Sequence, residues 1–138
     1  MKVHTTNYFD TFIQVAEDSQ AKTGEVPPMK GSEKTVANIQ FEMICNQPYQ
    51  YTSDDVLFET YATRQGFAKS ELAAEREKFF SKGQPCLRAS PLTKRYGWGV
   101  HSNSEGKVAL YSRDSKEYEK FSTDAKVETV KAMRSKRA

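Results

Sequence analysis

The segment from Lys82 to His101 constrains the fold more than any other part of this chain. Its sequence, KGQPCLRASPLTKRYGWGVH, holds three glycines and two prolines in 20 residues. Proline fixes φ, and glycine opens backbone conformations that are closed to other residues, so the chain has few paths here. The segment also carries four cations, the only tryptophan and no acid. It therefore predicts a shaped, positively charged surface element.

The length and composition are those of a small folded protein. With 138 residues, the chain has the size of one domain, and we predict a single domain over residues 1–138. Hydrophobic residues make up only 37% of the chain, but aromatic residues make up 12%, and each of them buries a large area. No apolar run approaches the length of a bilayer span, so no membrane partner is expected.

The first residues and the cysteines bear on the compartment. Polar residues follow the first methionine and no apolar stretch succeeds them, which argues against a secretory signal and predicts a cytoplasmic protein. Cys45 and Cys86 are then expected to be reduced thiols. Because the two cysteines and two histidines are widely scattered, we predict no metal site, and no motif calls for a cofactor.

Charge is distributed unevenly along the chain, although the net charge is only +3. Residues 1–81 carry 8 cations against 12 anions, a net −4, whereas residues 82–113 carry 6 cations against one anion, a net +5. Two interpretations remain open. The two halves pair and neutralise each other, or the basic surface binds an anion such as a phosphate, a nucleic acid or an acidic partner.

The first half of the chain predicts one strand and three helices. Residues 8–16 alternate as a strand does, and residues 17–34 form a long irregular loop with two consecutive prolines. A helix is expected over 35–45, and a second begins at the capping box of Thr52 and Asp55 and ends at Gly66. Ser70 is expected to cap a third helix that closes at Lys82.

The second half predicts a hairpin and short helices. Ser90 and Pro91 begin a helix of one or two turns. Strands are expected over 98–102 and 107–111, with Trp98, Val100, Val108 and Leu110 on the inner face. Asp114 and Glu117 predict a capping box, and a last helix is expected from Asp124, with an apolar stripe at Val127, Val130 and Met133 and a basic C-terminal tail.

Together these elements indicate an α+β fold. The predicted core is a small antiparallel sheet, formed by the N-terminal strand and the late hairpin, with several helices packed on one side. The N-terminal strand is expected to join the hairpin because a lone hairpin is only marginally stable.

Five stretches carry a resemblance to a known family. They are HTTNYFDTFI at 4–13, YTSDDVLF at 51–58, FFSKGQPCLRASPLTKRYGWGVH at 79–101, VALY at 108–111 and AMRSKRA at 132–138. In these the chain resembles a family of small bacterial proteins of unknown function, over nearly its whole length. The resemblance implies a bacterial cytosolic protein and carries over no catalytic or binding residue.

The strongest candidate site is an anion pocket at the start of the Ser90 helix. A helix N-terminus offers free N–H groups and the positive end of the dipole. Arg88, Lys94 and Arg95 lie close by in the sequence, and His101 follows. The alternative is that Ser90 only caps the helix, which is what serine usually does at this position.

Nucleic-acid binding is a weaker hypothesis for the same segment. Tyr96, Trp98 and His101 lie among cations, and bases of single strands stack on aromatic rings beside cations. However, Trp98 and Val100 alternate as core residues do, and no nucleic-acid-binding motif is present.

An enzyme that uses Cys86 or His101 is a further alternative. Cations and a helix start near Cys86 favour a thiolate, and His101 is a candidate base on the strand face opposite Trp98. Gly97 and Gly99 share the His101 face and leave bare backbone that a ligand can approach. Against this, a cysteine is often a small buried hydrophobe, and nothing in the spacing sets a Cys–His geometry.

We therefore predict a non-enzymatic binding domain with a basic surface over residues 82–113. An anionic small molecule or an acidic partner would contact Arg88, Ser90, Lys94, Arg95 and His101. The alternatives are a cytosolic enzyme that uses Cys86 or His101 and a structural subunit of an oligomer.

Overall fold

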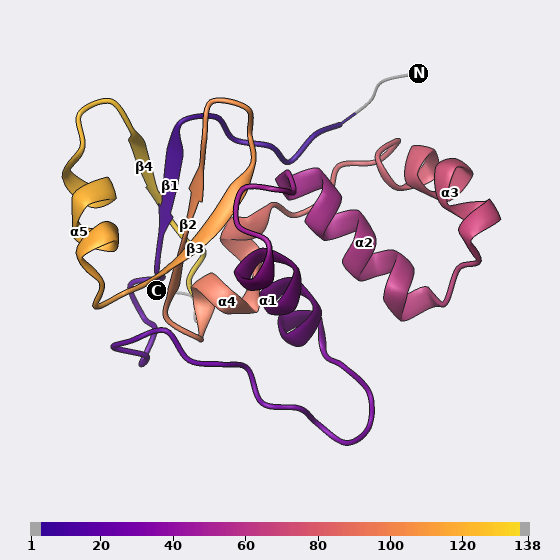
Figure 1. Cartoon of the computed structure of the whole chain (residues 1–138), viewed down its shortest axis with the longest axis horizontal. Coiled ribbons are helices and arrows are strands. Elements are labelled where there is room, and N and C mark those ends of the chain that lie inside the picture. The colour runs from indigo at the N-terminus through magenta and orange to yellow at the C-terminus, as the bar shows by residue number, and fades with distance from the viewer. Residues whose placement is uncertain (1–3, 136–138) are drawn as a thin grey trace.

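A mixed four-stranded sheet forms the centre of the computed structural model, which describes residues 4–135 (Figure 1). The strand order is β3-β2-β1-β4. Strand β1 pairs antiparallel with β2, β2 pairs antiparallel with β3, and β4 pairs parallel with β1. The predicted α+β fold, with the N-terminal strand joined to the late hairpin, is confirmed. The strands are β1 (Thr11–Gln14), β2 (Trp98–Ser102), β3 (Val108–Ser112) and β4 (Glu128–Lys131).

The helix predicted from Asp124 is wrong, because this segment forms strand β4. Val130 lies opposite Ile13 of β1, and the N–H of Ala132 donates to the carbonyl of Gln14 at 2.9 Å. The apolar stripe suggested a helix, but Met133 is 53% exposed, and pairing with β1 outweighs helical periodicity. The sheet is therefore mixed rather than wholly antiparallel. The predicted basic tail lies partly outside the described residues.

Strand β1 is shorter than the predicted strand over 8–16. Asp10 has a φ of 48°, which is incompatible with a strand, and Phe9 before it is 57% exposed. After the strand, the N–H of Val15 donates to the hydroxyl of Tyr118 at 2.8 Å. The backbone conformation of Asp10 and the hydrogen bond from Val15 to Tyr118 limit the strand to four residues.

Residues 4–135 form five α-helices, and polar caps begin most of them. Thr52 and Asp55 form the predicted capping box, and that helix ends at Gly66, which has a φ of 72°. The last helix is capped by Ser115, whose Oγ accepts from the N–H of Tyr118, rather than by the predicted Asp114 box. The helices are α1 (Val36–Asn46), α2 (Ser53–Gln65), α3 (Leu72–Phe79), α4 (Pro91–Lys94) and α5 (Lys116–Thr123).

Helices cover both faces of the sheet, which corrects the expectation that they pack on one side (Figure 1). On the α5 face, the ring of Phe12 packs edge-on against Tyr118 at 4.9 Å between centroids. On the other face, Ile13 and Val100 join the main core with Leu92 of α4. Phe12 and Ile13 are consecutive, and each is at most 1% exposed, so β1 is buried from both sides.

Helices α2 and α3 extend away from the sheet and have a small core of their own (Figure 1). Phe58 and Phe80 are buried in it. Arg76 lies over both rings, at 5.7 and 5.5 Å from their centroids, and pairs with Asp55 at 2.9 Å. Predicted Ser70 is not a helix cap, because it lies within a single turn of 3-10 helix over Lys69–Glu71 that precedes α3.

The segment over residues 17–34 has no helix or strand, yet hydrogen bonds fix it to the body. The indole N–H of Trp98 donates to the carbonyl of Glu25 at 2.8 Å, and the Asn38 amide donates to the carbonyl of Pro27 at 2.9 Å. Arg113 donates to the carbonyl of Ala21 at 2.9 Å. Between residues 4 and 135, no helix is long and apolar enough to cross a membrane.

Candidate functional site

Ser90 uses its polar groups inside the protein. Its Oγ accepts from the N–H of Leu92 at 3.2 Å and donates to Oε1 of Gln40 at 2.6 Å, while its carbonyl accepts from the N–H of Thr93 at 3.2 Å. Ser90 is only 4% exposed, and α4 is a single turn of four residues. It therefore caps α4 and links it to α1, which is the alternative that the sequence left open.

The three cations near Ser90 differ in their surroundings. Arg88 lies in η2, a turn of 3-10 helix over Leu87–Ala89; its Nε donates to the carbonyl of Lys131 at 2.7 Å, and its own carbonyl accepts from the N–H of Met133 at 2.8 Å. Arg88 thereby ties η2 to the edge of β4. Lys94 is half-buried and Arg95 is exposed, and neither side chain forms an ion pair or a hydrogen bond with another described residue.

His101 lies on the other face of the sheet, against α5. Its ring stacks on Phe121 with centroids 4.0 Å apart, and its Nδ1 lies 2.9 Å from the hydroxyl of Tyr49. The Tyr49 hydroxyl also lies 2.8 Å from that of Tyr111. Burial lowers the pKa of His101, against the opposite effect of the Asp10 and Asp124 charges. The same strand face thus holds a packed aromatic cluster that includes the histidine.

The glycines beside His101 do not leave an open surface, which corrects the expectation of approachable backbone. A Cβ added to Gly99 would lie 2.5 Å from Cζ of Phe12 and 2.8 Å from Cε2 of Tyr118. A Cβ added to Gly97 would lie 2.3 Å from the carbonyl oxygen of Thr23. The protein itself therefore fills the space in front of both glycines.

Cys86 and His101 are not brought together. The Cys86 sulfur lies 3.4 Å from the hydroxyl of Tyr8, and the residue begins η2 on the opposite side of the sheet from α5. Burial, followed by the hydrogen bond to Cys86, raises the pKa of Tyr8. Trp98 is also occupied, because its ring packs 5.5 Å from Phe41 and its N–H bonds to the loop.

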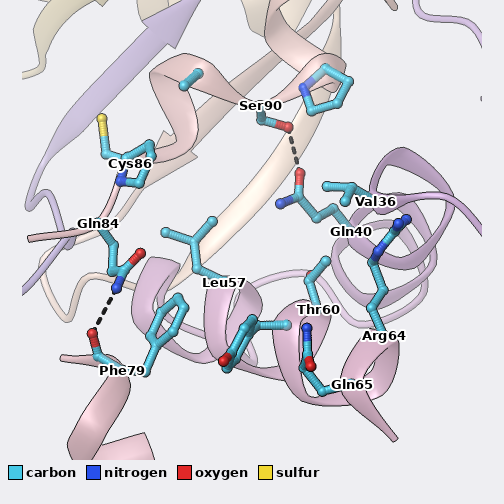
Figure 2. A pocket seen from close by; sticks show the side chains of 14 residues that line it. Val36, Gln40, Leu57, Thr60, Arg64, Gln65, Phe79, Gln84, Cys86 and Ser90 are labelled. Carbon is cyan, nitrogen blue, oxygen red and sulfur yellow. Dashed lines mark hydrogen bonds between the residues drawn. The ribbon is translucent and has the colours of Figure 1, made fainter. Parts of the chain in front are cut away.

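A cavity of about 300 Å³ lies between α1, α2 and residues 84–91 (Figure 2). We call it the α1–α2 pocket. Leu57, Thr60, Tyr61 and Arg64 share one face of α2 because they are spaced at i, i+3, i+4 and i+7. The pocket is lined by Val36, Gln40, Leu57, Thr60, Tyr61, Arg64, Gln65, Phe79, Gln84, Pro85, Cys86, Ala89, Ser90 and Pro91.

The Gln40 side chain is one of three buried polar residues in the lining of this pocket, with Thr60 and Ser90. It is 2% exposed, and its Oε1 accepts from Ser90 (Figure 2). Its Nε2 has no hydrogen-bond partner among residues 4–135, and Figure 2 shows this nitrogen turned toward the side that Leu57 lines. The sulfur of Cys86 points away from Gln40 and Leu57 in the same view. Gln40 therefore presents a donor to the cavity, whereas Cys86 does not present its thiol.

Arg64 supplies the charge at the edge of the pocket. It is exposed, and no carboxylate within the described part of the chain lies at ion-pair distance from it. Around Arg64 and Gln40 the walls are mainly apolar, with Leu57, Phe79 and Pro85 among them. Within residues 4–135, no group of three or more His, Cys, Asp or Glu side chains is placed to hold a metal ion.

Gln40 and Arg64 are not among the site residues predicted from the sequence, although α1 carries a usable signal. Val36, Ile39, Met43 and Ile44 follow the spacing of one apolar helix face, and Gln40 is the polar residue on that face. A glutamine in such a stripe must be hydrogen-bonded internally or face a cavity. Arg64 offers no comparable signal, because an exposed arginine in a last helical turn is common.

Comparison with curated proteins and with solved structures gives no match. A family model does match, over residues 3–138, and its description is "Family of unknown function (DUF6157)". The match covers nearly the whole chain and confirms the resemblance seen in the sequence. The protein therefore belongs to the DUF6157 family of unknown function.

Proposed function

We propose that this protein is a non-enzymatic binding domain that takes a small organic ligand in the α1–α2 pocket. The Gln40 amide carries the proposal. Gln40 is 2% exposed as a residue, and its Nε2 has no protein partner among the described residues, so its N–H groups are left for whatever occupies the cavity. Ligand sites typically combine apolar walls with a few convergent polar groups, and a volume of about 300 Å³ is at the small end of their range.

The pocket modifies the prediction of a basic anion-binding surface over residues 82–113. Residues 84–91 form one wall of the pocket, so this segment still contributes to the proposed site. Arg88 and Ser90 form internal hydrogen bonds, and His101 packs against α5. Lys94 and Arg95 stand outside the lining and add positive potential to that side of the molecule.

The other predictions give way to this proposal for specific reasons. An enzyme that uses Cys86 or His101 on one shared surface is disfavoured, because the two residues lie on opposite sides of the sheet and His101 is stacked on Phe121. A cytoplasmic location remains part of the proposal, and Cys45 and Cys86, which are free cysteines in the structure, would be reduced thiols there. Light scattering of the purified protein tests the remaining alternative, a subunit of an oligomer.

A fragment screen with a plugged variant tests the proposal. Neutral and charged fragments are screened by ligand-observed NMR against the wild type, Ala89→Phe and Ala73→Phe. Ala89 lines the pocket, whereas Ala73 is exposed on α3 and does not line it. We expect hits on the wild type and on Ala73→Phe that disappear with Ala89→Phe. Hits that survive in Ala89→Phe, or an absence of hits on the wild type, would overturn the proposal.

A further inference from the structure

We infer that the ligand of the α1–α2 pocket is a small organic carboxylate with an apolar body. Its carboxylate would accept from Nε2 of Gln40, and the guanidinium of Arg64 at the edge of the pocket would favour its negative charge. This inference rests on the binding function proposed above and adds the chemical class of the ligand. Three features of the pocket support it, and they concern its donor, its charge and its walls.

The buried donor requires an acceptor. Nε2 of Gln40 carries two N–H groups, and neither has a partner among the described residues. A ligand that displaces water from these N–H groups must present an oxygen, because a donor that it covered and left unpaired would cost about 1–3 kcal/mol. In the structure the Ser90 hydroxyl donates to Oε1 of Gln40 at 2.6 Å and accepts from the N–H of Leu92 at 3.2 Å, and this arrangement leaves Nε2 of Gln40 facing the cavity.

The charge of the lining selects an anion among the possible acceptors. Arg64 is the one charged side chain among the described residues that line the pocket, and no acid lines it. Glu33 and Lys34 line an adjoining hollow, also bordered by Arg64, and Lys34 pairs with Glu42 at 2.7 Å. A neutral carbonyl would satisfy Gln40 alone, whereas a carboxylate is also attracted by the positive charge of Arg64 at the edge of the pocket.

The walls select an apolar body for the rest of the ligand. Tyr61 stacks on Phe79, with centroids 4.9 Å apart and an angle of 30° between the planes. Leu57, Pro85 and Pro91 add further apolar surface, although Thr60, Gln65 and Gln84 also line the pocket. Burial of ligand carbon against these groups contributes about 25 cal/mol per Å² of apolar area. Inorganic phosphate, or the phosphate group of a nucleotide, has no apolar surface to pack against these walls.

Matched acid and amide pairs test the chemical class. The probes are phenylacetate with phenylacetamide and hexanoate with hexanamide, titrated into the full chain by NMR at low salt. We expect each acid to bind the wild type about tenfold more tightly than its amide, a difference of about 1.4 kcal/mol. The preference should disappear in Arg64→Met and persist in Arg95→Met, because Arg95 is exposed and does not line the pocket.

The outcomes separate this inference from the proposed function. Equal binding of acids and amides, abolished by Ala89→Phe, would overturn the carboxylate class and leave the binding function in place. Binding of neutral fragments without binding of either acid would do the same. If neither the acids nor any screened fragment binds the wild type, both proposals fail. Arg64 is exposed, so Arg64→Met keeps the fold, and a fall in acid affinity with added salt gives a second measure of the charge.

Discussion

The two sides of the sheet fill space in different ways. On the α5 side, the rings of Phe12, Tyr118 and Phe121 pack closely and leave no room for a side chain at Gly99. On the other side, α1 and α4 pack on the sheet, but a cavity remains between α1, α2 and residues 84–91. The sequence pointed to the glycine face as the open one. The difference teaches that the protein's own aromatic rings can fill the space in front of a strand face that carries glycines. A buried amide whose N–H groups have no protein partner is a better sign of a cavity.

The two sides should differ most in the stability that is lost when one apolar side chain is truncated on each. Phe12 is fully buried, so Phe12→Ala should cost about 3–5 kcal/mol of unfolding free energy. Leu57 is only partly buried and already borders a cavity, so Leu57→Ala should cost clearly less. Urea denaturation of both variants measures the difference. Equal losses would show that the pocket wall is packed as tightly as the α5 face.

Adding a methyl group tests the close packing of the α5 side directly. The Cβ of Gly99→Ala would meet the Phe12 and Tyr118 rings at 2.5 and 2.8 Å, and overpacking of this kind costs about 1–3 kcal/mol. Gly83→Ala is the matched control, because the nearest atom to its added Cβ is Nδ1 of His4 at 3.9 Å. That control should leave stability unchanged or slightly raised. Thermal denaturation of the two variants measures the change in stability. An unchanged stability of Gly99→Ala would show that the Phe12 and Tyr118 rings move to accommodate the methyl group.

Much of the fold is predictable because local signals and packing agree. The Thr52 capping box, the Gly66 helix end and the hairpin strands each satisfy backbone groups locally. The segment after Asp124 fails because its alternatives differ only in long-range pairing. Val130 fits a helix stripe and a strand equally well, and only the position opposite Ile13 decides between them.

The candidate site is less predictable because it joins segments that are distant in sequence. Gln40, Arg64 and Pro85 meet only after α1, α2 and residues 84–91 pack together. Residues 82–101 attracted attention through their charge and glycines, yet Arg88 bonds to Lys131 and Gly99 is covered by rings. Internal hydrogen bonds and ring packing use the residue types that binding sites use, so composition alone does not separate the two.

The link between α1 and α4 should show coupling in a double-mutant cycle. Gln40→Met removes the acceptor of the buried Ser90 hydroxyl and should cost about 1–2 kcal/mol. Ser90→Ala loses the same bond together with the α4 cap. Because the two changes share one hydrogen bond, the double variant should cost less than the sum of the single variants. Urea midpoints of the four proteins measure the coupling, and strict additivity would contradict the contact.

The aromatic cluster on the α5 side should make stability depend on pH. Burial lowers the pKa of His101, so the unfolded chain binds a proton more readily than the folded one. Stability should therefore be highest above the unfolded pKa of about 6.5 and fall as the pH drops toward the lower folded value. The effect should be modest, because the ring is partly exposed and the charges of Asp10 and Asp124 oppose it.

Comparison with His101→Gln isolates this contribution. Glutamine offers an acceptor to the Tyr49 hydroxyl but does not titrate. The stability of the variant should therefore fall less than that of the wild type when the pH is lowered from neutral to mildly acidic. The depressed pKa of Asp55 acts in the same direction only at more acidic pH. Urea midpoints at several pH values measure both slopes. Identical slopes would assign the dependence to other groups.

The smallest effect should separate two arginines that the sequence treated alike. Arg88→Ala removes the bond from Nε to the carbonyl of Lys131 and should cost about 0.5–1 kcal/mol, because the bond is exposed. Arg95 contacts no described side chain through an ion pair or hydrogen bond, so Arg95→Ala should stay within about 0.5 kcal/mol of the wild type. Amide hydrogen exchange localises the difference. In Arg88→Ala, amide exchange should become faster along β4 and at the N–H of Met133, because the Arg88 side chain no longer holds that edge of the sheet to η2. Faster exchange spread over the α5 face instead would show that Arg88 stabilises the whole sheet rather than its outer strand.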